Sequence, residues 1–150
     1  MALKAWHTQQ SRAGKLVQDL SDEALGQSVA PGRNSVLYLL GHLVAVNDGM
    51  LSLFGLAGRQ YADLDEAYIK NPDRSGLPMA DAAALRHAWQ RSNETLNRYF
   101  EQMPAADWFA RHNAMTDEDL ANDPGRNKLS VLLNRTNHLA YHLGQMALVK

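Results

Sequence analysis

The stretch Asn137-His138-Leu139-Ala140-Tyr141-His142-Leu143-Gly144-Gln145 carries two histidines four residues apart near the C-terminus. It contains no proline and has helix-forming residues on both sides, so it is predicted to be an α-helix. Residues four apart on a helix project from the same face, one turn from each other. His138 and His142 can therefore both reach one metal ion.

A third ligand has to come from another part of the chain, and His42 is the best candidate. It lies in Leu39-Leu40-Gly41-His42-Leu43, within the most apolar stretch of the sequence. A buried histidine needs a partner for its ring nitrogens, either a hydrogen bond or a metal. Three neutral imidazoles leave coordination positions open for water or substrate, as in catalytic sites. Ordinary hydrogen-bonded histidines are the simpler alternative, since a pair at this spacing also arises by chance.

Length and composition indicate a single globular domain, residues 1–150. Hydrophobic residues make up 45% of the chain and charged residues 21%, as in ordinary soluble proteins. The net charge of −1 gives no electrostatic reason to expect nucleic acid or a membrane as a partner. The absence of cysteine excludes disulfides, thiolate ligands and a cysteine nucleophile. With no signal peptide and no run of 18 apolar residues, we expect a cytoplasmic protein.

The spacing of apolar residues predicts four long helices. Their expected bounds are residues 3–20, 35–55, 78–103 and 129–150. The second, with Asn34 or Ser35 as its N-cap, is apolar nearly all round from Val36 to Val46, which places it inside a bundle. Long polar connections, residues 56–78 and 104–128, are of the kind that cross a fold or border a site. The acidic run at 116–119 is interpreted as a solvated turn or helix start, because it lacks the ligand pattern of a calcium loop.

The two histidine-bearing helices begin alike. Pro31-Gly32-Arg33-Asn34 precedes one and Pro124-Gly125-Arg126-Asn127 precedes the other. These are efficient turn-and-cap sequences, and two copies are too few for a repeat protein. At 1.5 Å per residue, His42 lies roughly 12 Å into its helix and His142 roughly 12 Å before the end of its own. Antiparallel neighbouring helices would therefore bring the three rings to the same level, although a parallel pair with a modest offset is also acceptable.

These features together resemble the DinB-like (DinB/YfiT) family of metal-binding four-helix bundles. The resemblance rests on the four predicted helices, on His42 followed by leucine, and on His-Leu-Ala-Tyr-His-Leu-Gly-Gln at residues 138–145. It implies an all-α, four-helix bundle with up-down-down-up topology, and often a homodimer. It also implies a divalent metal held by His42, His138 and His142, with nickel or zinc most usual and iron or manganese as further candidates.

The resemblance further implies a range of activities, including S-transferases and isomerases that depend on a low-molecular-weight thiol, and metal-dependent hydrolases. A metal held by three neutral histidines lowers the pKa of a bound water or thiol and so provides a nucleophile near neutral pH. We therefore expect a small electrophilic molecule as substrate. Candidates for orienting the substrate or fixing an imidazole tautomer are Tyr38, Asn134, Tyr141 and Gln145. Two alternatives are a non-catalytic, stress-associated bundle with a structural metal, and a helical bundle without metal.

Overall fold

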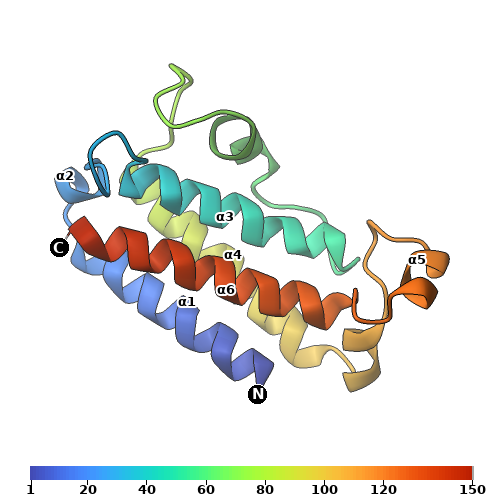
Figure 1. The fold of residues 1–150 in the computed structure, drawn as a ribbon. Helices are drawn as coiled ribbons and strands as arrows, with labels where there is room; N and C mark the ends of the chain where they lie inside the picture. The colour runs from blue at the N-terminus through green and yellow to red at the C-terminus, as the bar shows by residue number, and fades with distance from the viewer. Residues whose placement is uncertain (150) are drawn as a thin grey trace.

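The computed structural model describes residues 1–149, and this part of the chain is all-helical, which confirms the predicted all-α class (Figure 1). Four long helices lie side by side: α1 (Ala2–Asp19), α3 (Val36–Leu53), α4 (Ala82–Gln102) and α6 (Lys128–Met146). Shorter helical pieces connect or extend them: α2 (Asp22–Leu25), η1 (Ala62–Leu64), η2 (Glu66–Lys70), η3 (Ala105–Phe109), α5 (Asp117–Asn122) and η4 (Ala147–Val149).

Contacts between side chains and backbone fix the relative direction of α1 and α4. The Arg86 guanidinium, early in α4, donates to the carbonyls of Val17 and Leu20 at the end of α1. The indole of Trp6, early in α1, donates to Asn97 late in α4 at 3.1 Å. These two helices are therefore antiparallel.

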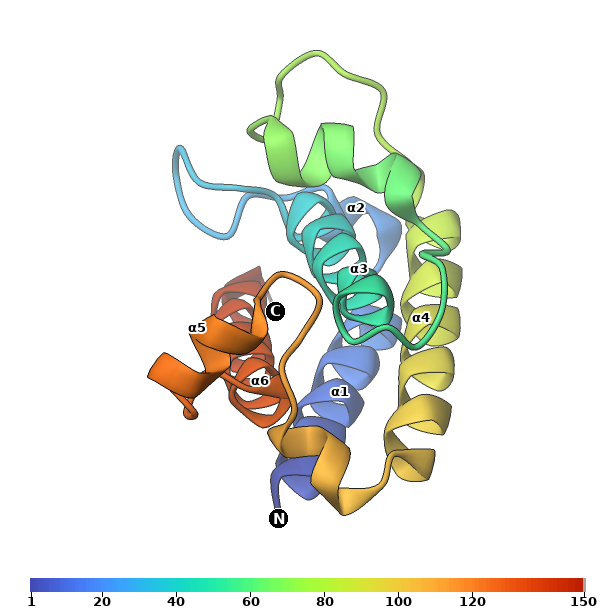
Figure 2. The same cartoon turned by 90° about the vertical axis from the view of Figure 1, so that its right-hand side faces the viewer.

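The helices that carry the histidines are also antiparallel. Leu53 at the end of α3 lines a cavity with Arg135 from the first half of α6, while His42 meets His142 in the second half of α6. α1 packs along α6, and α3 packs along α4. In Figures 1 and 2, α1 and α6 run in one direction and α3 and α4 run in the other.

Side-chain caps determine where the helices begin. Ser35, one of the two predicted N-caps, accepts the backbone N–H of Tyr38 at the start of α3. The third helix was expected to start at Pro78, and this was wrong. α4 begins at Ala82, because the Asp81 carboxylate accepts the N–H of Ala84 and so supplies the cap. The acidic run after Thr116 forms the start of α5. A helix start was one of the two structures predicted for this run, the other being a solvated turn.

The predicted last helix differs at its C-terminal end. α6 ends at Met146 and the chain continues as the 3₁₀ turn η4, so the helix does not extend through the predicted residues 147–149. Lys150 lies outside the described residues.

α3 forms the centre of the hydrophobic core, as its apolar sequence predicts. It packs in one cluster with Trp6 of α1, Phe100 of α4 and Leu139 of α6. By length and composition α3 could cross a membrane, but 67% of that span is buried inside the fold. The core helix of a soluble protein has the same properties.

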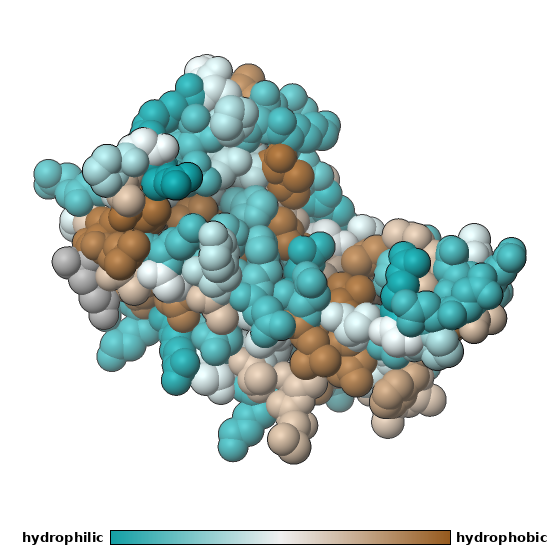
Figure 3. Space-filling model, in the orientation of Figure 1, coloured by the Kyte–Doolittle hydropathy of each residue, from teal (hydrophilic) through white to brown (hydrophobic). Residues whose placement is uncertain are grey.

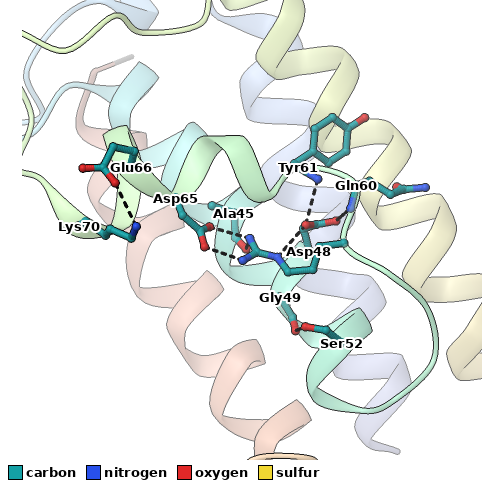
Figure 4. A network of polar contacts seen from close by, with 10 residues as sticks. Ala45, Asp48, Gly49, Ser52, Gln60, Tyr61, Asp65, Glu66 and Lys70 are labelled. Carbon is teal, nitrogen blue, oxygen red and sulfur yellow. Dashed lines mark hydrogen bonds and ion pairs between the residues drawn. The ribbon is translucent and has the colours of Figure 1, made fainter.

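The segment between α3 and α4 covers the outer side of α3 (Figure 2). Asp48, fully buried, accepts the backbone N–H groups of Gln60 and Tyr61 and the Nε–H of Arg59. Arg59 also pairs with both carboxylate oxygens of Asp65 at 2.5 and 2.6 Å (Figure 4). Every charge in this network has a partner, so it ties the connection to α3 without leaving an isolated buried ion.

Farther along this connection, the ring of Tyr68 packs directly against the backbone of α3 at Gly41. A Cβ atom at Gly41 would lie 2.3 Å from a ring carbon of Tyr68. Real Cβ contacts are never this short, so glycine is required next to His42. The close approach also holds the Tyr68 backbone near the His42 ring, and it therefore links the fold to the histidine site.

We expect Gly41→Ala to lower the free energy of unfolding by about 1–3 kcal/mol, because the added methyl group overpacks the Tyr68 contact. Chemical denaturation measures this change. Gly49→Ala on the same helix is the matched control, since nothing lies within 4 Å of its Cβ position. It should raise stability by roughly 0.5–1 kcal/mol through helix propensity. Equal effects of the two substitutions would contradict the role assigned to Gly41.

Candidate metal centre

Three histidine rings converge where α3 crosses α6. The Nε2 atom of His138 lies 3.2 Å from Nε2 of His42 and 3.0 Å from Nε2 of His142. One ring nitrogen from each residue falls within a group whose atoms all lie within 4.8 Å of one another, and each residue is partly buried. The structure thus brings together the three residues that the sequence singled out, from segments 96 residues apart.

The Nδ1 atoms of two rings have acceptors of their own. Nδ1 of His42 lies 2.9 Å from the backbone carbonyl of Tyr68, which can only accept. This carbonyl is free to do so because Tyr68 lies in the last residues of the short helix η2. Nδ1 of His142 lies 2.7 Å from the side-chain oxygen of Gln145. In their neutral forms both rings therefore carry the proton on Nδ1 and a lone pair on Nε2.

This proton arrangement fits a bound cation. The Nε2 lone pairs of His42 and His142 both face Nε2 of His138. If His138 carries its proton on Nε2, that proton can be donated to only one of the two. If His138 instead carries its proton on Nδ1, that buried atom has no hydrogen-bond partner among the described residues. Nitrogens about 2.0–2.1 Å from a tetrahedral metal ion are about 3.3 Å apart, close to the spacing found here. A divalent metal would satisfy all three Nε2 atoms at once.

Burial keeps two of the rings neutral. It lowers the pKa of His138 to about 4, with further lowering by His142, His42 and Arg135. Burial also lowers the pKa of His142, partly opposed by its hydrogen bond to Gln145. Neutral imidazole is the form that binds metals. Both rings are thus ready to bind a metal at neutral pH without first losing a proton.

The four residues predicted to assist the site lie in different places. Gln145 contacts His142, and its amide N–H₂ donates to the Tyr141 hydroxyl at 3.2 Å. The Tyr38 ring stacks on His42 with an interplanar angle of 7°, and its hydroxyl donates to the carbonyl of Asn71. Asn134 is exposed and lines a cavity instead, and it does not partner the unsatisfied Nδ1 of His138.

Sequence reasoning missed two groups at this site. The Tyr68 carbonyl gives no sequence signal, because a backbone oxygen is brought to His42 only by the path of the connection. Arg135 did give a signal. It precedes His138 by three residues and His142 by seven, the spacing of one helical stripe.

Two surface cavities, each with a volume of about 480 Å³, share Arg135 of α6 in their linings, and neither lining includes His42, His138 or His142. The first is lined by α3 residues from Ala45 to Leu53 and by Arg59, Ile69, Asn113, Ala114 and Arg135. The second lies between the end of α3, the residues around His112 and the first half of α6. In Figure 3 the surface is indented between the lobe of the 56–81 segment and the lobe that carries α5. The first cavity begins at Ala45, about one helical turn from His42 on α3.

Comparison with known proteins identifies the family and the fold. The sequence profile of the DinB superfamily matches residues 5–146. The chain belongs to the DinB superfamily. A crystal structure of a DinB-like protein from Bacillus cereus ATCC 10987 is similar with a TM-score of 0.71 and 18% sequence identity, covering 99% of this chain and 87% of that chain. At this identity the likeness shows the fold. No curated protein matches the sequence.

We expect this DinB-superfamily protein, when free of metal, to lose stability as the pH falls from about 6.5 to about 4. In this window the unfolded chain protonates His138, with its ordinary pKa of 6.5, whereas the folded chain keeps the ring neutral because its pKa is about 4. Above pH 6.5 both states are neutral and this residue contributes no pH dependence.

Thermal denaturation across this pH range provides the measurement. His138→Gln is the matched variant, because glutamine removes the titrating ring and keeps a polar side chain. Its stability should fall less steeply over the same window. Parallel loss of stability in both proteins would assign the pH dependence to other groups.

Proposed function

We propose that this protein binds one divalent metal ion through the Nε2 atoms of His42, His138 and His142 and uses it to act on a small electrophilic molecule. The convergence of three Nε2 atoms, at least two with facing lone pairs, carries the proposal. When bound there, the metal would act as a Lewis acid and lower the pKa of a water or thiol. Nickel and zinc are the first candidates, because imidazole suits both, with iron or manganese next.

The chain's own residues would prepare the site. The Tyr68 carbonyl and Gln145 fix the tautomers of His42 and His142, so that the Nε2 atoms stay available. The Tyr141 hydroxyl accepts from Gln145 and so orients its amide. Both reactions expected from the sequence fit these roles: hydrolysis, or transfer of a low-molecular-weight thiol to the electrophile. The first cavity, which begins about one helical turn from His42 on α3, is large enough for a small substrate.

The remaining expectations complete the proposal. The four long helices would form the family's up-down-down-up bundle, with α2, α5 and the short turns as additions to it. A homodimer and a cytoplasmic location stay predictions. Figure 3 shows a largely hydrophilic face with separate apolar patches, and it gives no interface.

Elemental analysis of the untagged protein should find about one equivalent of metal per chain. His42→Ala and His138→Ala should each lose it, because each removes one of three ligands. His87→Ala is the matched control, since His87 is exposed on α4, away from the three rings, and it should retain the metal. The proposed metal centre would be contradicted if both ligand variants retained the metal, or if the His87→Ala control lost it to the same extent.

A catalytic metal and a structural one differ in what its removal does. We expect the chelated protein to stay folded with a modest fall in melting temperature, because one cluster of buried apolar side chains already joins the four long helices. Turnover of activated esters, or of electrophiles supplied with a thiol, should be lost and should return on adding metal. A large fall in melting temperature, with no turnover by the metal-loaded protein, would instead favour the structural alternative.

A further inference from the structure

Arg135 lies on the same stripe of α6 as the two histidines. It precedes His138 by three residues and His142 by seven, so the three side chains leave the helix on the face toward α3. Its charge is near enough to contribute to the lowered pKa of His138. The α-carbons of residues 135 and 138 are separated by a rise of about 4.5 Å along the helix axis.

The Arg135 guanidinium has no acidic partner among the described residues. Its Nε is buried without a hydrogen-bond acceptor. Burial lowers its pKa, and no carboxylate contributes in the opposite direction. Arg59, which lines the same cavity, differs in this respect because Asp48 and Asp65 both bind it. The positive charge of Arg135 is thus left uncompensated in the protein alone.

Arg135 also lies where the two cavities meet. Leu53, Ala114 and Arg135 line both of them. Neither lining includes an aspartate or a glutamate among the described residues. The first cavity extends along α3 from Ala45, about one turn beyond His42, so a molecule in it would contact Arg135 with one end about one helical turn from His42.

We propose that Arg135 binds a carboxylate or phosphate group of the substrate in the cavity between α3 and α6, with the reacting end of the molecule at the three histidines. The inference rests on the proposed function, and it narrows the substrate to a small anionic electrophile. A partly buried, unpaired guanidinium lowers stability, which an incoming anion would offset. Its planar fork of N–H donors matches both oxyanions.

The simpler alternative is that Arg135 extends into solvent and binds nothing. Its partial exposure allows this, and the lack of a protein partner would then reflect hydration of the guanidinium terminus. The two accounts differ in anion binding. Only the first predicts a site that saturates with a simple oxyanion and depends on this one arginine.

The experiment measures binding of sodium acetate and of inorganic phosphate to the protein as purified, by calorimetry at constant ionic strength and pH 8. Wild type should bind at least one of the two anions, and Arg135→Gln should bind it at least ten-fold more weakly, since a charge-assisted bidentate contact is lost. Arg135→Lys, which keeps the charge and loses the fork, should fall between them. Acetate bound more tightly indicates a carboxylate substrate, and phosphate bound more tightly indicates a phosphorylated one.

Arg98→Gln is the matched control, because it removes an exposed arginine of α4 that lines neither cavity. It should bind anions as wild type does. No anion binding by wild type, or equal binding by Arg135→Gln, would overturn the inference. Arg135→Gln is expected to melt no lower than wild type, because it removes an unpaired, partly buried charge. If it nevertheless fails to fold, the comparison of wild type with Arg135→Lys decides.

Metal content measured in the same samples separates this inference from the proposed function. Arg135→Gln keeps all three histidines, so it should retain its metal. Anion binding that depends on Arg135 in a protein that holds no metal would leave the anion site standing and remove the metal-dependent function. A protein that holds the metal but binds no anion would leave the proposed metal centre standing and remove the anion site.

Discussion

Three Nε2 atoms directed at one point form the constraint on which the rest of this structure depends. The Tyr68 carbonyl and Gln145 take the Nδ1 protons of His42 and His142, so the lone pairs face inward. Facing lone pairs repel each other. Protonation does not relieve the repulsion at neutral pH, because burial keeps the pKa of His138 near 4. A cation is the simplest group that converts this repulsion into attraction.

The bundle meets the constraint through packing at a distance from the rings. α3 and α6 run antiparallel, which brings His42 level with the pair on α6. Gly41 lets the Tyr68 ring lie against α3, and this contact delivers the carbonyl to His42. The Asp48–Arg59–Asp65 network ties down the start of the same connection. Packing at Gly41 and the Asp48–Arg59–Asp65 ion pairs therefore position the Tyr68 carbonyl, which in turn orients the His42 ring.

Much of this could be predicted from sequence, for identifiable reasons. The spacing of His138 and His142 and the apolar surroundings of His42 are local patterns that survive folding, and so is the cap at Ser35. The start of α4 was misplaced because Pro78 is an acceptable first-turn residue, whereas the side chain of Asp81 supplies the cap hydrogen bond. The Tyr68 carbonyl could not be foreseen, since its position depends on the path of the whole connection. Arg135 could be placed on the histidine stripe, but its lack of a partner is a tertiary property.

The distribution of apolar contacts bears on whether a metal at this centre is catalytic or only structural. The core cluster joins α1, α3, α4 and α6 through residues such as Trp6, Leu43, Phe100 and Leu139. All four long helices are thus held together by burial of apolar side chains. Two of the rings have neighbours that face open space. Tyr141, next to His142, is exposed to solvent, and Val46, one turn from His42, lines a cavity. Because apolar side chains already join the four helices, a metal at the three histidines fits the proposed role in substrate binding better than a purely structural one.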